Sequence, residues 1–231
     1  MTISLITGAN KGLGFETARR LAGAGHTVYV GARDSSRGQS AAQSIGARFV
    51  QLDVTDQESV DAAARAIEQA EGHLDVLVNN AGIGGPYRPA PEIGGTEMRD
   101  VFETNVFGVV RVTQAFIPLL ERSANPVIVN VGSSIGSKAL VMNPDRIEST
   151  LPVLAYGASK AALVMVTLQY AKALPSFKIN IVEPGFTATD FNAHRGPQTV
   201  EEGAEIIVRM ANLDRSGPTA TFQDRHGTLP W

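Results

Sequence analysis

The sequence contains no cysteine among its 231 residues, and this absence excludes disulfide bonds and thiol nucleophiles. A structural zinc site is disfavoured on related grounds, because the four histidines share no ligand spacing and no thiolate can join them. No apolar run reaches the ~20 residues that cross a bilayer. We therefore expect a cytoplasmic protein that holds no metal and does not enter a membrane.

Charge is also scarce. Charged residues make up 19% of the chain, and 20 Lys and Arg against 23 Asp and Glu give a net charge of -3 without long blocks of one sign. This balance favours neither nucleic acid nor an anionic membrane as a partner, so small molecules are the expected ligands. A hydrophobic content of 43% without any linker predicts a single domain over residues 1–231.

Short apolar runs alternate with stretches of helical periodicity. The runs are Thr2–Thr7, Thr27–Ala32, Arg48–Leu52, Leu74–Val78, Val127–Val131 and Lys178–Val182. Because helices would separate successive strands, the pattern predicts an α/β fold, a doubly wound parallel sheet with helices on both faces. Ligands bind such sheets beyond the carboxyl ends of the strands, so the residues after each run are the first candidates for a site.

A glycine-rich turn, Gly8-Ala9-Asn10-Lys11-Gly12-Leu13-Gly14, joins the first run to a helical pattern. Strand, turn and helix in this order let the backbone approach a pyrophosphate and direct free N–H groups and the positive helix end toward it. The spacing differs from the commoner Gly-x-Gly-x-x-Gly. The turn indicates a Rossmann-like three-layer domain with a bound dinucleotide, and a tight turn without a ligand is the alternative.

The second run leads into Arg33 and Asp34, which bear on the choice of nicotinamide cofactor. Asp34 lies 34 − 14 = 20 positions after Gly14, a distance at which an acidic residue is typical of NAD(H) sites. If the strand ends at Ala32, however, Arg33 is the first side chain to face the ribose, and Lys11 lies nearby. Guanidinium and ammonium groups bind phosphate, so we expect NADP(H) to be preferred, with NAD(H) possible.

Tyr156 and Lys160 lie four residues apart in a stretch that otherwise carries no charge. On a helix this spacing places both side chains on one face. A nearby ammonium favours the phenolate and lowers the pKa of a phenol from ~10, so Tyr156 is a candidate general acid and base. The pair alone is weak evidence, because chance pairs of this spacing are common.

Further short motifs make the chain resemble the short-chain dehydrogenase/reductase family over nearly its whole length. The matching pieces are Thr7-Gly8-x-x-x-Gly12-x-Gly14, Asp53, Asn79-Asn80-Ala81-Gly82, Asn105, Ser133, Tyr156-x-x-x-Lys160 and Pro184-Gly185 with Thr189. Each piece is modest, but the joint match in the family's order is highly specific. Within the family, Ala32-Arg33-Asp34 followed by Arg37-Gly38-Gln39 is similar to the NADPH-dependent carbonyl reductases.

The resemblance implies a mechanism. Tyr156 would donate its proton to a ketone oxygen as hydride arrives, or accept it in the reverse oxidation, and Ser133 would hydrogen-bond the same oxygen. Lys160 would lower the pKa of Tyr156 and hold the nicotinamide ribose. Asn105, in a helix predicted over Met98–Leu120, would join Lys160 to a proton relay through water.

The resemblance also implies which residues contact the cofactor. They are Gly8, Asn10, Lys11, Gly12, Leu13, Gly14, Arg33, Leu52, Asp53, Val54, Asn80, Ala81, Gly82, Tyr156, Lys160, Pro184, Gly185, Thr187 and Thr189. The segment Glu183–Thr189 would surround the nicotinamide amide, with Thr189 as the main side-chain contact.

Ser133 and Ser134 compete for the position of the catalytic serine. Matching Gly136 to the family's strand-end glycine selects Ser133, and Ser134 is the alternative. The gap to Tyr156, 156 − 133 = 23, exceeds the family's usual dozen or so. The extra residues, within 138–152, are expected to form a loop or short helix at the rim of the site, which either shapes substrate choice or is a solvated decoration.

Two helices are more apolar than a monomer requires. Ala161–Ala171 carries no charge, and Met98–Leu120 is similar, so each helix is apolar beyond the face that covers its own sheet. The pair predicts a homodimer or homotetramer with a four-helix interface, which is also common in the family that the chain resembles.

Two segments near the end of the chain complete the predictions. Asp190–Gln198 is polar and follows the expected nicotinamide segment, so it is either a lid over the substrate or an ordinary surface loop. Thr219–Phe222 is predicted as a final strand, and we expect the tail up to Trp231 to pack against the sheet edge or a neighbouring subunit.

The sequence therefore predicts an enzyme, an NADPH-dependent oxidoreductase that transfers hydride between nicotinamide and a ketone, an aldehyde or a secondary alcohol. An NADP-binding sensor or scaffold without turnover is one alternative. An epimerase or dehydratase that uses the same residues is another.

Overall fold

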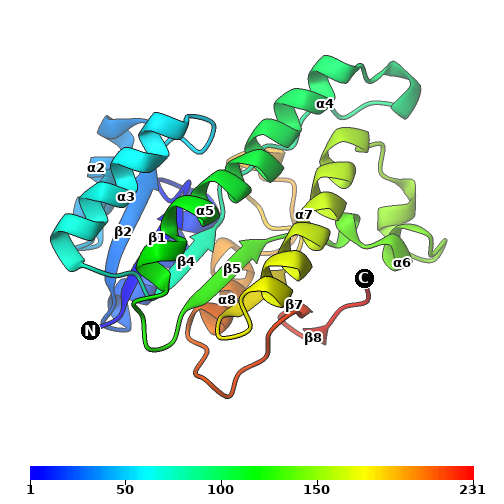
Figure 1. The fold of residues 1–231 in the computed structure, drawn as a ribbon. Coiled ribbons are helices and arrows are strands. Elements are labelled where there is room, and N and C mark those ends of the chain that lie inside the picture. Colours follow the sequence, from blue (N-terminus) through cyan, green and yellow to red (C-terminus); the bar gives the residue numbers. More distant parts are fainter.

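A computed structural model describes residues 1–231 and contains an eight-stranded sheet between two layers of helices (Figure 1). The strands are β1 (Ile3–Thr7), β2 (Thr27–Ala32), β3 (Arg48–Gln51), β4 (Val76–Asn79), β5 (Val127–Val131), β6 (Lys178–Val182), β7 (Phe222–Asp224) and β8 (Gly227–Thr228). Their order is β3-β2-β1-β4-β5-β6-β7-β8, parallel except for the pair β7 and β8. The predicted doubly wound α/β fold is confirmed.

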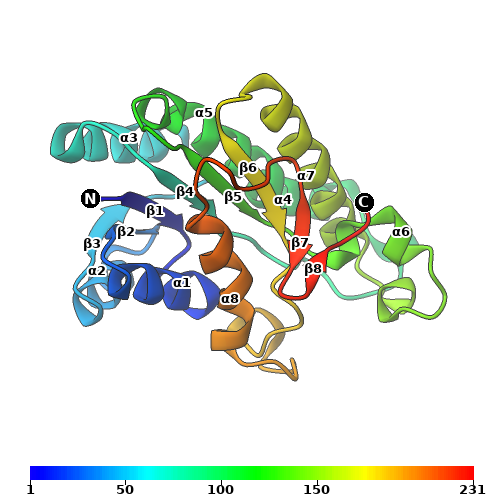
Figure 2. The same cartoon turned by 90° about the horizontal axis from the view of Figure 1, so that it is seen from below.

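Helices cover both faces of the sheet (Figure 2). The α-helices are α1 (Gly12–Gly23), α2 (Ser35–Ser44), α3 (Gln57–Glu71), α4 (Gly95–Phe102), α5 (Gly108–Leu120), α6 (Lys138–Val141), α7 (Leu154–Ala173) and α8 (Val200–Ala211). On one face Leu5 joins the core that contains Phe116 of α5, and on the other its neighbour Ile6 joins the core that contains Ile207 of α8. Burial on both faces explains why the strands are almost purely apolar. None of the helices combines the length and the apolar character that crossing a bilayer demands.

A buried polar chain fixes α7 over the centre of the sheet. The Asn79 side-chain amide donates to Asn130 Oδ1 at 2.9 Å, and the Asn130 amide donates to Thr167 Oγ1 of α7 at 2.9 Å. Buried polar groups are costly unless they are paired, so this chain permits few other placements of the helix. The position of the residues that α7 carries is thereby set from within the core.

Two strands begin two or more residues later than predicted. β4 begins at Val76 rather than Leu74, because the Leu74 N–H bonds Leu119 O at 3.1 Å instead of joining the sheet. The last parallel strand begins at Phe222 rather than Thr219, because Ala220 has a positive φ of 55° and cannot continue an extended strand.

The helix predicted over Met98–Leu120 is also interrupted. α4 and α5 are separated by a π-helical turn, Glu103–Phe107, in which the Gly108 N–H bonds the carbonyl of Glu103. Such turns insert one residue into a helix and are frequent at functional sites. Asn105 lies in the turn and is fully buried.

The tail packs against the sheet edge, as expected. β8 pairs with β7, and the Trp231 ring stacks on Phe222 with centroids 5.8 Å apart. The Trp231 carbonyl also accepts from the Ala139 N–H at 3.1 Å. The tail therefore supports α6, the helix inside the extra residues 138–152.

Candidate active site

The predicted site residues come together at the carboxyl ends of β1, β4, β5 and β6. The glycine turn after β1 is the first wall. Gly8 and Gly12 have φ values of +64° and +57°, a left-handed conformation that favours glycine. At Gly14 a Cβ would collide with Asn80 Nδ2 and lie 2.9 Å from the Gly8 carbonyl oxygen, so no larger residue fits. The turn thus leaves its backbone bare at the amino end of α1, where a pyrophosphate can bind.

Asn80 holds this turn in place. Its side-chain amide donates to the Thr7 carbonyl at 2.8 Å, while Thr7 Oγ1 accepts from the N–H groups of Asn80 and Ala81 at 3.0 Å each. A Cβ at Gly8 would lie 3.0 Å from Ala81 Cα. The ends of β1 and β4 are therefore joined by the residues that the sequence assigned to the cofactor.

The end of β2 separates the two candidates for the adenosine ribose. β2 ends at Ala32, as expected, and Asp34 caps α2 by accepting from the Arg37 N–H at 3.0 Å. Arg37 also pairs with the Asp34 carboxylate at 3.4 Å. Arg33 is exposed and takes part in none of the ion pairs of the structure. The Arg33 guanidinium is thus free to bind a ligand, whereas the Asp34 carboxylate is bound to residues of α2.

The residues after β3 form the neighbouring wall. Leu52 and Val54 are buried, and the Asp53 carboxylate accepts from the N–H and the hydroxyl of Thr55 at 2.9 and 2.7 Å. These bonds fix the direction of the carboxylate and leave its second oxygen available for a ligand.

Tyr156 and Lys160 lie on one face of α7. Lys160 Nζ lies 5.6 Å from the centroid of the Tyr156 ring and donates to the Val131 carbonyl at 2.7 Å. Gly136 permits this arrangement, because a Cβ there would lie 2.7 Å from the Lys160 backbone. The turn after β5 and α7 therefore meet at a contact that only glycine allows.

The electrostatics of this pair differ from the expectation. Burial raises the pKa of Tyr156, the negative charge of Glu183 raises it further, and a hydrogen bond from Ser133 opposes both. The expected lowering by Lys160 was wrong, because removal of the phenol from water outweighs the nearby amine. Burial lowers the pKa of Lys160 to about 8, against the opposite effect of Glu183.

Ser133 and Ser134 act on different side chains. The Ser133 hydroxyl favours the charged forms of Tyr156 and Glu183 and so acts to lower the pKa of each. The Ser134 hydroxyl acts in the same way on the pKa of Glu148, which is buried within residues 138–152 and paired with Arg146 at 2.9 Å. Ser133 thus acts on the tyrosine, and Ser134 acts on the extra segment.

Asn105 connects the loop after β4 to α7. Its Oδ1 accepts from the Ile83 N–H at 2.8 Å, and its Nδ2 donates to the Ile83 carbonyl at 2.9 Å and to Ser159 Oγ at 3.0 Å. At Gly82 a Cβ would lie 3.3 Å from Asn105 Oδ1. The side chain of Asn105 thus positions the loop, and its part in a proton relay stays a prediction.

The segment after β6 closes the site. A 3-10 turn, Asp190–Asn192, follows Thr189, and Lys11 of the glycine turn pairs with Asp190 at 2.9 Å. The Phe191 ring lies 5.6 Å from the Tyr156 ring. This segment therefore spans the candidate site from the glycine turn to the tyrosine.

The remaining predicted contacts belong to the same segment. Gly185 has a φ of +86°, and Thr187 is buried with its hydroxyl donating to the Gly185 carbonyl at 3.2 Å. The Pro184 carbonyl accepts from the Gln198 side chain. These contacts hold the backbone of the segment in one conformation, in which it could line the amide group of a nicotinamide.

Sequence reasoning missed the role of Glu183. Its Oε1 accepts from the Gly185 N–H at 2.8 Å, its Oε2 accepts from the Ser134 N–H, and burial raises its pKa. A carboxylate directly after an apolar strand and before Pro184-Gly185 was the available signal. The predicted mechanism has no role for a carboxylate at this position, so no pattern in the sequence selected Glu183.

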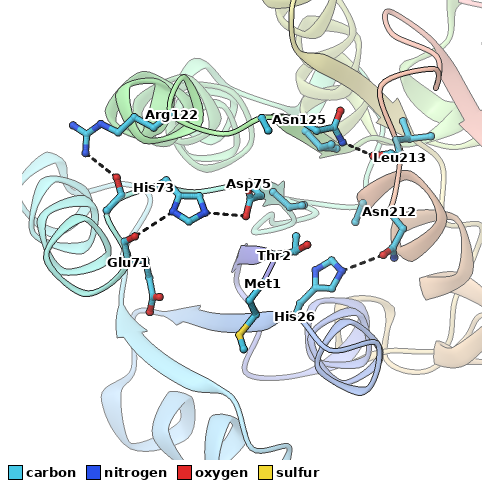
Figure 3. Close-up of a pocket in the computed structure, with 15 residues that line it drawn as sticks. Met1, Thr2, His26, Glu71, His73, Asp75, Arg122, Asn125, Asn212 and Leu213 are labelled. Carbon is cyan, nitrogen blue, oxygen red and sulfur yellow. Dashed lines mark hydrogen bonds and ion pairs between the residues drawn. The ribbon is translucent and has the colours of Figure 1, made fainter.

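A separate cavity lies at the opposite end of the sheet, at the amino ends of the strands (Figure 3). It has a volume of about 770 Å³, and its polar side chains bond one another: His73 pairs with Asp75 at 3.3 Å, and His26 Nε2 bonds Asn212 at 3.1 Å. Asp75 also accepts from the Ile3 N–H at 2.8 Å. These contacts tie the amino-terminal loops together and leave no group poised for chemistry.

Comparisons with known proteins show the family of the chain. The family model for short chain dehydrogenases matches residues 2–200. (-)-Isopiperitenone reductase of Mentha piperita is 34% identical over 98% of this chain and 97% of its own length. The structure of salutaridine reductase from Papaver somniferum is 30% identical, with a TM-score of 0.83, and the match covers 96% of this chain and 99% of that one.

A further solved structure, described as a short chain dehydrogenase from Shigella flexneri complexed with NADP, is 26% identical with a TM-score of 0.85, and the match covers 96% of each chain. The chain belongs to the short-chain dehydrogenase/reductase family. It is accordingly an oxidoreductase, of a family that binds nicotinamide cofactors and acts on small molecules.

Proposed function

We propose that the protein is an NADPH-dependent reductase of ketones and aldehydes, which also oxidises secondary alcohols in the reverse direction. The position of Lys160 Nζ, 5.6 Å from the centroid of the Tyr156 ring, carries this proposal, because it places a cation behind a candidate proton donor. A carbonyl oxygen beside Tyr156 would receive its proton, and Ser133 would hydrogen-bond the same oxygen.

Each polar residue has a defined part in the reduction. Bound NADPH would supply the hydride that adds to the carbonyl carbon. Tyr156 transfers its proton to the carbonyl oxygen, and Ser133 stabilises the charge that grows on this oxygen. The raised pKa of Tyr156 keeps the phenol protonated at neutral pH, which is the form that a reductase needs. Lys160 lies behind the ring and stabilises the phenolate that remains.

The preference for NADPH rests on the end of β2. Arg33 is exposed there without an ion pair, and Lys11 lies in the glycine turn, whereas the Asp34 carboxylate caps α2. An arginine binds a phosphate through two parallel N–H bonds. Arg33 would therefore bind the 2′-phosphate of NADPH more strongly than the 2′-hydroxyl of NADH. Binding of the phosphate would draw Lys11 away from Asp190.

The substrate is proposed to be an apolar carbonyl compound. Ile83, Phe186 and Phe191, in the segments after β4 and β6, expose 39%, 58% and 53% of their surface, although large apolar side chains are usually buried, and the Phe191 ring lies 5.6 Å from that of Tyr156. Exposed apolar groups beside a polar reaction centre favour a ligand that covers them.

The first experiment measures consumption of NADPH, and separately of NADH, by purified protein with a panel of ketones, aldehydes and quinones. Turnover in the wild type that is absent in Tyr156→Phe supports the proposal. NADPH binding without turnover of any compound would favour a sensor or scaffold. Conversion of a compound with no net change of cofactor would favour an epimerase or dehydratase.

Arg33→Ala tests the cofactor preference. Loss of a charged hydrogen bond of about 1.5–3 kcal/mol should raise the KM for NADPH by about 10- to 100-fold and leave that for NADH unchanged. Arg65→Ala, which removes an exposed arginine of α3, is the matched control for charge. Equal losses with both cofactors would contradict a role in binding the 2′-phosphate.

We further propose that the active protein is a homodimer or homotetramer. Phe107 and Met165 expose 48% and 55% of their surface on the helical faces of the π turn and α7 that point away from the sheet. Light scattering after gel filtration measures the mass in solution. The proposal predicts at least a dimer, and Met165→Glu should reduce that mass, since a buried charge disfavours the interface.

A further inference from the structure

The extra segment, residues 138–152, lies in the chain between the two groups proposed to contact the substrate oxygen. It follows Ser133 and the short turn Ser134–Gly136, and it ends just before α7, which carries Tyr156. Its two parts, α6 and a 3-10 turn at Ile147–Thr150, pack against each other. The chain thus leaves the candidate site beside Ser133 and returns to it beside Tyr156.

α6 is bound to the tail that follows β8. The buried Ser137 hydroxyl donates to the Pro230 carbonyl at 2.8 Å. The same oxygen accepts from the Leu140 N–H at 3.2 Å, so it also caps α6. The Ala139 N–H donates to the Trp231 carbonyl at 3.1 Å. In both ribbon views the tail ends beside α6 (Figure 1, Figure 2).

The tail is itself anchored in the core. The Trp231 ring stacks on Phe222 with centroids 5.8 Å apart, and the Leu229 N–H donates to the Phe222 carbonyl at 2.8 Å. Phe222 is fully buried in one cluster with Ile181 of β6 and Leu163 of α7. The tail therefore connects α6 to the same cluster on which α7 packs.

Ser133 and Tyr156 are held by contacts that do not involve the tail. The Gly132 N–H, next to Ser133, donates to the Val182 carbonyl of β6 at 2.7 Å. α7 is fixed to the centre of the sheet by the amide of Asn130, which donates to it at 2.9 Å. Loss of the tail contacts should therefore displace α6 and leave the groups for proton transfer in place.

We propose that Trp231 is a positioning residue, which holds the extra segment at the rim of the site and thereby determines which substrates bind well. Met142 and Ile147 of this segment are exposed although they are apolar, which favours an apolar substrate that is large enough to reach them. A small aldehyde does not reach the segment. The proposal rests on the proposed carbonyl reduction and adds to it a residue that sets the range of substrates.

Trp231→Ala tests the proposal with the largest and the smallest carbonyl compound that the wild type reduces. Loss of the aromatic contact should raise KM for the large compound by about 2- to 10-fold, and should leave its kcat and the KM for the small compound unchanged. Trp231→Phe keeps a ring against Phe222 and should restore KM. An equal rise of KM for both compounds, or a loss of kcat with KM kept, would overturn the proposal.

His226→Ala is the matched control. His226 is exposed between β7 and β8, and its side chain takes part in none of the hydrogen bonds or ion pairs of the structure. This variant should keep both KM values. NADPH binding, followed by the emission of the nicotinamide, should be equal in all four proteins and reports that each is folded. A rise of KM for the large compound in His226→Ala as well would contradict a specific role of Trp231.

A second measurement needs no turnover. Trp231 is the only tryptophan of the chain and exposes 40% of its surface, so its emission reports on the tail alone and can become more accessible. Ser137→Ala removes the bond to Pro230 from the side of the segment, so quenching of the emission by acrylamide should increase. Ser149→Ala, which removes an exposed hydroxyl elsewhere in the segment, should leave quenching unchanged.

Equal quenching in the wild type and in Ser137→Ala would show that the tail and the segment are not coupled, and the proposal would fail. A wild type that reduces no carbonyl compound would instead count against the proposed function. The quenching result would still decide whether the tail holds the segment.

Discussion

Polar side chains cluster at both ends of the sheet, but their surroundings differ. At the amino-terminal end, Asp75 is shared by a backbone N–H and His73, and the groups around the cavity bond one another (Figure 3). At the carboxyl-terminal end, Tyr156 and Lys160 are held where burial disfavours the charged form of each. The polar side chains of the amino-terminal end hold loops together, whereas Tyr156 and Lys160 at the carboxyl-terminal end have shifted pKa values.

The contrast teaches that the size of a cavity and the presence of histidines do not identify the site. The amino-terminal cavity has a volume of about 770 Å³ and contains His26 and His73, yet both histidines bond structural partners there. Perturbed pKa values distinguish the other end, because catalytic acids and bases need environments that shift them. The following predictions test this contrast.

The largest expected effect is the loss of turnover in Tyr156→Phe. Removal of a general acid lowers kcat by about 10²- to 10⁴-fold, and the ring that contacts Phe191 is kept, so cofactor binding and stability should be unchanged. Steady-state assays with any substrate of the wild type measure kcat, and titrations with NADPH measure cofactor binding. Full activity in the variant would remove the proton donor from the proposed mechanism.

Lys160 should give the next largest effect, on stability. Its pKa in the folded protein, about 8, lies below the ordinary value of 10.5, so the unfolded chain binds this proton more tightly between these two values. The free energy of unfolding should therefore rise with pH in this range. Between pH 7 and 9.5 the gain attributable to Lys160 is about 2 kcal/mol.

Urea unfolding of the wild type and Lys160→Met at both pH values isolates this term. The difference between the two proteins should change in favour of the wild type by that amount as pH rises. Lys172→Met, on an exposed position of the same helix, should show no such change. A constant difference for Lys160→Met would mean that the amine is not buried as the structure has it.

The sequence was sufficient for those features that depend on local pattern. The runs Thr27–Ala32, Val127–Val131 and Lys178–Val182 are strands with the predicted bounds, because parallel strands buried on both faces are continuous apolar runs. The glycine turn could also be predicted from the sequence. Gly8 and Gly12 adopt conformations that other residues rarely take, and this need is visible in the residue type.

Features that depend on partners distant in the chain were not predictable. The π turn around Asn105 involves Ile83 and Ser159, which no local pattern connects. The direction of the Tyr156 pKa was wrong because the sequence shows the neighbouring lysine but not the burial or the charge of Glu183. Tertiary contacts decided both.

At the amino-terminal end, Asp75→Asn should affect stability alone. The amide keeps one acceptor oxygen but places an NH₂ group beside a donor, either Ser123 or the Ile3 N–H, at a cost of about 1 kcal/mol. Thermal unfolding and the kcat of the same preparation make the test. A loss of turnover as large as that of Tyr156→Phe would abolish the distinction between the two ends of the sheet.

The smallest effect concerns the ion pair between Lys11 and Asp190, which spans the carboxyl-terminal end. Both side chains are more than half exposed, so the pair contributes little to stability, and Asp190→Asn should unfold with the wild type. The substitution nevertheless releases Lys11 for the 2′-phosphate. NADPH should therefore bind up to about fivefold more tightly, while NADH binding stays unchanged, as fluorescence titrations with both cofactors would show. Weaker binding of both cofactors would mean instead that the pair closes over the cofactor and holds it, so that even this exposed contact belongs to the working end of the sheet.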